Sequence, residues 1–133
     1  MPEKYLFEYA VIRVVPRVER EEFLNVGLIM YSRDLKFLQA RFQLDQNKLL
    51  TFAAQADQEE IEEHLKAICL ISKGEEGSGP IGKLDLSERF RWLTATRSTI
   101  VQTSKVHPGL CEDAAATLTK LHQQLVLPPQ QDQ

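Results

Sequence analysis

Three arginines and the only tryptophan of the chain fall within one segment, residues 88–102, together with four serine or threonine hydroxyls. Guanidinium groups bind carboxylates or phosphates through paired hydrogen bonds, and hydroxyls add neutral donors that orient the bound group. The segment therefore predicts a surface that binds an anionic group. The residues assigned to this surface are Arg89, Arg91, Arg97, Ser98 and Thr99.

The local structure around these arginines has two readings. A short helix that starts at Ser87 fits the pattern, and so does a strand through Phe90 and Trp92. In either geometry we expect the two aromatic side chains to anchor the segment in the core and leave Arg89 and Arg91 exposed. The alternative is that these arginines only cover apolar surface with their aliphatic stems.

Arg13 interrupts an otherwise apolar strand pattern, where a charge needs either a partner or a wet cleft. Glu8, Glu22 or Asn25 can supply that partner, and a ligand can supply it instead. If Arg13 contacts a ligand, Arg17 is placed to extend the same anion-binding surface.

His107 is the candidate for general acid or base work, because its ordinary pKa lies near neutral pH and it follows the arginine segment. It stands beside a turn suggested by Pro108 and Gly109, so a structural role is equally open. No complete catalytic signature is present, and the catalytic residues are unknown from sequence. His64 and His122 lack matching ligands, so neither a metal nor a cofactor is expected.

The composition is that of one globular domain: 133 residues, 43% hydrophobic and 26% charged. Two cysteines are too few for a disulfide scaffold, and no signal peptide or membrane span is evident, so we expect a cytoplasmic protein. The net charge is −3, but residues 83–107 carry five basic and two acidic groups. This local excess can hold an anion and is too small for a typical duplex-DNA binder.

Three strands are predicted at 5–15, 23–31 and 37–42, and two main helices at 57–72 and 113–126. A glycine-rich loop covers 73–82, and residues 128–133 are predicted to form a flexible tail after a single domain of residues 1–127. The predicted fold class is α+β, with an antiparallel sheet of three to five strands packed against two or three helices.

Two blocks, residues 9–29 and residues 89–99 followed by Val106–Leu110, resemble the bacterial domain of unknown function 3037 family. The resemblance covers most of the chain and carries no known activity. Genes of this family are often found beside a gene for a HipA-like kinase, so the resemblance suggests a kinase of that type as a protein partner. Thr96 stands where the family has proline. The positions that the resemblance singles out are Arg13, Arg17, Glu19, Glu22, Asn25, Gly27, Arg89, Arg91, Trp92, Arg97, Ser98 and His107.

The function predicted from these observations is a non-enzymatic binding or accessory module whose arginine-rich surface engages an anionic group on a protein partner or a phosphate-containing ligand. The alternative is an enzyme that acts on a phosphorylated or nucleic-acid substrate, with Arg89, Arg91, Arg97 and His107 in its site. Binding of single-stranded nucleic acid through Trp92 is less favoured, because few aromatic residues accompany the arginines.

Overall fold

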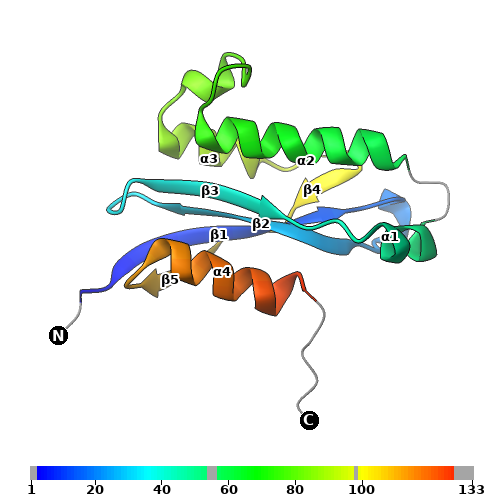
Figure 1. Cartoon of the computed structure of the whole chain (residues 1–133), viewed down its shortest axis with the longest axis horizontal. Coiled ribbons are helices and arrows are strands. Elements are labelled where there is room, and N and C mark those ends of the chain that lie inside the picture. The colour runs from blue at the N-terminus through cyan, green and yellow to red at the C-terminus, as the bar shows by residue number, and fades with distance from the viewer. Residues whose placement is uncertain (1–2, 54–56, 98, 128–133) are drawn as a thin grey trace, which may run out of the picture.

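The computed structural model describes residues 3–53, 57–97 and 99–127, so the predicted tail at 128–133 and Ser98 lie outside the described residues. One five-stranded antiparallel sheet and four α-helices form a single small α+β domain, as the sequence predicts (Figure 1). No helix in the described ranges combines the length and apolar character needed to cross a membrane.

The sheet is built around its first strand. β1 (Tyr5–Val14) pairs with β2 (Leu24–Ser32) along one edge, and β2 pairs with β3 (Phe37–Phe42). Along its other edge β1 pairs first with β5 (His107–Cys111) and then with β4 (Val101–Thr103). The three strands predicted at 5–15, 23–31 and 37–42 are therefore confirmed, and β4 and β5 complete a sheet within the predicted three to five strands.

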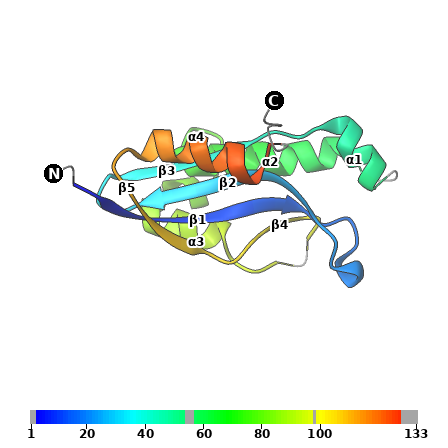
Figure 2. The ribbon, with the colours of Figure 1, turned by 90° about the horizontal axis from the view of Figure 1, so that it is seen from below.

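Helices cover both faces of the sheet (Figures 1 and 2). α2 (Gln58–Lys73) and α3 (Leu86–Leu93) lie on one side, and α4 (Ala114–Leu125) lies on the other. α1 (Gln46–Phe52) follows β3 and buries Leu49 in the same core as α2. Because helices cover both faces of the sheet, alternate side chains of β1 enter opposite hydrophobic cores. This explains why β1 is apolar at almost every position.

The two cores divide the residues of β1 by parity. Ala10, Ile12 and Val14 pack with α2 and α3, whereas Phe7 and Tyr9 pack on the α4 side. Odd-numbered residues of β1 therefore face α4, because successive side chains of a strand point to opposite faces. This parity fixes on which side of the sheet each candidate functional residue lies.

Aspartates begin the four α-helices. At α2 the Asp57 carboxylate accepts a hydrogen bond of 3.1 Å from the amide of Glu60, at the start of the helix predicted for 57–72. Gly74 ends that helix in the left-handed conformation, with φ of 67°. The helix predicted at 113–126 is α4, and its cap is Asp113.

A bulge interrupts the pairing of β1 and β2. Ile12 is opposite Gly27 and Arg13 is opposite Asn25, so Val26 is the extra residue. Gly27 lies so close to β3 that an added Cβ would stand 2.5 Å from the carbonyl oxygen of Arg41. The glycine is therefore required by close backbone approach.

Replacing Gly27 with alanine is expected to lower the free energy of unfolding by about 2–4 kcal/mol, because the contact is with backbone that cannot move alone. Urea denaturation measures the effect. Gly77→Ala is the control: Gly77 has φ of 89° and nothing within 4 Å, so alanine there costs only about 1–2 kcal/mol of backbone strain. An equal or smaller loss at Gly27 contradicts the close-contact explanation.

His122 adds a titratable group to the core beneath α4. Its side chain is 5% exposed, and its Nδ1 atom is buried without a hydrogen-bond partner among the described residues. Burial lowers the pKa of this imidazole, and the neighbouring Arg41 guanidinium lowers it further. Folding therefore favours the neutral form.

Because the folded-state pKa of His122 is lowered, its contribution to stability is complete above the unfolded pKa of about 6.5 and is lost as the pH falls from there through the folded value. Urea denaturation between pH 7.5 and 5 should show this loss in the wild type and a smaller loss in His122→Leu. His64→Gln, at a half-exposed helical position, should keep the wild-type profile. Identical profiles for wild type and His122→Leu contradict the assignment.

Candidate functional site

The arginine segment folds as helix α3, whose N-cap lies two residues before the predicted start at Ser87. The Asp85 carboxylate accepts from the amide of Glu88 at 2.8 Å, so Asp85 is the N-cap. The helical period then buries Phe90 and Leu93 against the sheet and turns Trp92 outward. The prediction that Trp92 anchors the core is wrong, and the strand reading of this segment is also wrong.

Arg89 is buried, with 8% of its surface exposed, so the prediction that it faces solvent is wrong. Its Nη1 atom donates hydrogen bonds of 3.0 Å each to the carbonyl oxygens of Ile71 and Ser72, at the end of α2. The Ile71 carbonyl also accepts from the amide of Gly74 at 3.1 Å, and the C-terminus of a helix attracts positive charge. Gly74 leaves room for the guanidinium, because an added Cβ there would lie 2.7 Å from Nη1. Arg89 thus caps α2 and joins it to α3.

Trp92 and Arg97 form the exposed part of the segment. Trp92 is 41% exposed, and the Cζ atom of Arg97 lies 4.2 Å from the centre of its ring. Arg97 also donates to the Trp92 carbonyl oxygen at 2.5 Å. The Arg97 guanidinium therefore covers one face of the Trp92 indole, and the rest of the indole is accessible to solvent.

Arg91 is exposed on the same helix, one residue before Trp92. Within the described residues the ion pairs are Arg20 with Glu22 and His64 with Glu60, so neither Arg91 nor Arg97 is neutralised by a carboxylate there. We refer to Arg91, Trp92 and Arg97 as the Trp92 surface. It combines an aromatic anchor with two uncompensated positive charges.

Arg13 lies on the opposite side of the sheet. It occupies an odd position of β1, with Asn25 across one edge and Gln102 of β4 across the other. Its Cζ atom is 4.0 Å from the centre of the Phe23 ring. None of the three expected partners engages it: Glu22 binds Arg20 at 2.6 Å, Asn25 donates to the carbonyl of Leu125, and Glu8 has the parity of the other face.

Two further predicted residues lie near this end of the sheet. Arg17 is exposed in the turn after β1, and Thr99 is exposed just before β4, where its hydroxyl donates to the Val101 carbonyl at 2.7 Å. The amide of Val15 donates to the carbonyl of Ile100, so the two segments run side by side (Figure 2). The structure thus brings Arg13, Arg17 and Thr99 to one end of the sheet.

His107 is part of β5 and not of a turn. It pairs with Tyr9, and the two ring centres are 5.3 Å apart on the α4 side of the sheet. Arg91 and Trp92 are on α3, which packs on the other side. The structure therefore does not join His107 to the arginines of α3, as a shared catalytic site requires.

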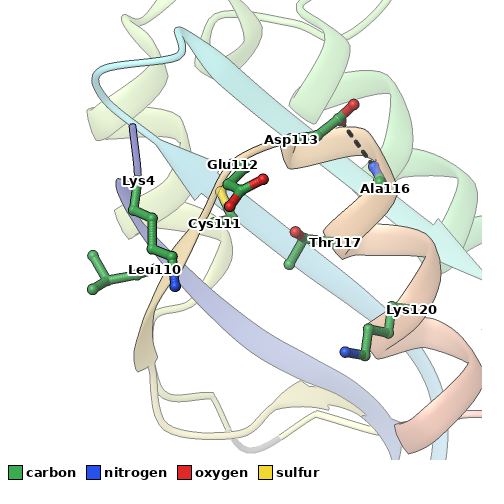
Figure 3. Close-up of a pocket in the computed structure, with 8 residues that line it drawn as sticks. All are labelled: Lys4, Leu110, Cys111, Glu112, Asp113, Ala116, Thr117 and Lys120. Atoms are coloured by element: carbon green, nitrogen blue, oxygen red, sulfur yellow. Dashed lines mark hydrogen bonds between the residues drawn. The ribbon is translucent and has the colours of Figure 1, made fainter. Parts of the chain in front are cut away.

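A hollow of about 370 Å³ lies where β5 turns into α4 (Figure 3). Lys4 and Lys120 stand on opposite sides of it, and the Thr117 hydroxyl lies between them. Cys111 lines it too, but burial raises the pKa of this thiol and so disfavours the reactive thiolate. Sequence reasoning missed this hollow because its lining joins Lys4, near the N-terminus, to residues 110–120. The described residues contain no group of three or more histidine, cysteine or acidic side chains placed to hold a metal ion.

The fold and these surfaces define a small α+β protein with an open antiparallel sheet and an exposed arginine–tryptophan surface. Residues 9–126 match the family described as protein of unknown function (DUF3037), and the chain belongs to that family. No significant match was found among curated proteins or among solved structures.

Replacing Arg89 with methionine is expected to lower the free energy of unfolding by about 2–4 kcal/mol, because the carbonyls of Ile71 and Ser72 each lose a charged donor in a buried position. Arg91→Met is the matched control on the exposed face of the same helix, and should change stability by about 0.5 kcal/mol or less. Urea denaturation of both variants measures the difference. Equal effects of the two substitutions contradict the capping role of Arg89.

Proposed function

We propose that the protein is a non-enzymatic binding module that docks an acidic segment of a protein partner on the Trp92 surface. The observation that carries the proposal is the exposure of Trp92 while Arg97 is stacked on its ring. Burying a large aromatic side chain gives a partner much apolar contact area, and tryptophan and arginine are enriched at the residues that dominate binding energy.

The charge around this surface favours an acidic partner. Residues 83–107 carry five basic and two acidic groups, and Arg91 and Arg97 have no carboxylate partner within the described residues. Arg97 is already fixed by its stack and by its bond to the Trp92 carbonyl. A carboxylate that binds it therefore orders little additional side chain, which lowers the entropic cost of association.

A HipA-like kinase is the first natural partner to test, because the family resemblance associates the two genes. The exposed surface supports contact with a protein in general and does not by itself select this kinase. The catalytic alternative gains no support from the position of His107 on the other side of the sheet.

The single tryptophan makes docking directly measurable. Titration with a tryptophan-free peptide of alternating glutamate and leucine should shift the emission of Trp92 to shorter wavelength and saturate, because a bound partner excludes water from the indole. Arg91→Ala/Arg97→Ala should weaken the affinity about tenfold or more, with lower salt dependence. Arg33→Ala, an exposed arginine in the turn between β2 and β3, should bind as the wild type does.

The same variants are then compared for co-elution with the purified HipA-like kinase. Unchanged peptide affinity in the double arginine variant overturns the proposal. An equal response to a lysine–leucine peptide also overturns it, because charge then plays no part. Kinase binding that is kept in Trp92→Ala excludes this surface as the kinase contact.

A further inference from the structure

We propose a second binding site, on the α4 side of the sheet, in which Arg13 binds a carboxylate group. The site consists of Arg13, Phe23 and Gln102, and we refer to it as the Arg13 site. It is independent of the Trp92 surface, which lies beyond the other face of the sheet.

The first argument is that the Arg13 guanidinium is held in place. The backbone of Arg13 is fixed because β1 is paired on both sides, with Asn25 of β2 and with Gln102 of β4 opposite this residue. Phe23, which is 46% exposed, immediately precedes β2 and places its ring 4.0 Å from the Arg13 Cζ atom. A cation stacked in this way keeps its nitrogen atoms available in the plane of the guanidinium.

The second argument is that Arg13 lacks an acceptor. Its Nε atom is buried without a hydrogen-bond partner, and no ion pair or hydrogen bond from its side chain is made to the described residues. Arg89 also has an unpartnered Nε atom, but its Nη1 atom donates to two carbonyls, and Nη1 of Arg41 donates to the Thr119 hydroxyl, whereas no atom of the Arg13 guanidinium donates to a described residue. A partly desolvated charge is costly when it is unpaired, so an external anion that binds it recovers free energy.

The neighbouring groups decide the class of anion. Asn25 and Gln102 are neutral, and the amide nitrogen of each is already used, on the carbonyls of Leu125 and Thr99. Arg13 is the one charged residue of the Arg13 site, so the site itself offers one positive charge and two parallel donors. This matches a carboxylate, which carries one negative charge and two acceptor oxygens, better than a doubly charged phosphate.

The bulge between β1 and β2 explains why the site exists at this residue. The extra residue, Val26, disturbs the register where Arg13 and Asn25 oppose each other. Although the two residues are opposed, Nε of Arg13 and Oδ1 of Asn25 are both buried without a hydrogen-bond partner among the described residues.

Arginine side-chain ¹H–¹⁵N correlation spectra test the proposal, with N-acetylleucine as a model of a peptide C-terminus, acetate as a small acid, and inorganic phosphate, all at equal ionic strength. One Nε–H signal of the wild type, absent from Arg13→Gln, should shift and saturate with N-acetylleucine. It should not respond to N-acetylleucinamide, which lacks the charge. A response to acetate as well assigns the site to small acids, and a response to N-acetylleucine alone assigns it to peptide C-termini; both outcomes support the carboxylate site.

Three variants complete the design. Arg13→Lys keeps the positive charge but lacks the two parallel donors of the guanidinium, so it should bind the carboxylate about tenfold more weakly. Phe23→Leu keeps Arg13 but removes the ring stacked on it, and should also weaken binding. Arg33→Gln should leave affinity unchanged, as should Arg91→Ala/Arg97→Ala, which separates this site from the Trp92 surface. Tighter binding of phosphate than of either carboxylate overturns the proposal. So does the absence of any saturable shift in the wild type, or equal binding by Arg13→Lys and the wild type.

Discussion

The pairing of β1 along both of its edges is the constraint on which the rest of the structure depends. β2 holds one edge, and β5 and β4 share the other. Both faces of β1 also enter hydrophobic cores, one beneath α2 and α3 and one beneath α4. A strand enclosed in this way has a fixed register, because a shift by one residue would exchange the contents of the two cores. The same constraint decides that Arg13 and Trp92 face opposite sides of the protein.

The strands and the two main helices were predictable because local patterns specify them. Alternating β-branched and aromatic residues mark β1, and Asp57 with its helical apolar stripe marks α2. β5 was not predicted, since Pro108 and Gly109 indicate a turn in isolation. Proline is nevertheless tolerated on an edge strand, where its missing N–H need not face a neighbour. Edge position is a tertiary property that the local sequence does not contain.

The candidate site was predicted only in part, and Arg89 shows why. Asp85 with Glu88 three residues later is a sequence signal for the start of α3, and it fixes the helical faces that bury Phe90 and expose Trp92. No comparable signal shows that the end of α2 lies beside Arg89, because that contact joins residues 17 and 18 positions apart across a loop. Residue type alone therefore does not separate an arginine that caps a helix from one that binds a ligand. The sequence also did not show that Arg13 lacks a partner, because Glu8, Glu22 and Asn25 were all expected to lie near it.

Ser104 has a consequence for how other molecules approach the sheet. Its hydroxyl accepts from the amide of Val11 at 2.9 Å, and its own amide donates to the Val11 carbonyl at 2.8 Å. Ser104 thereby continues the hydrogen bonding along this edge of β1 across the gap between β4 and β5. The edge that results consists of strands of three and five residues, the second of which contains Pro108. Such an edge gives an added strand few donors to pair with and discourages stacking of sheets from different molecules. The backbone of this edge is therefore a poor template for strand addition, in contrast to a long and regular edge strand.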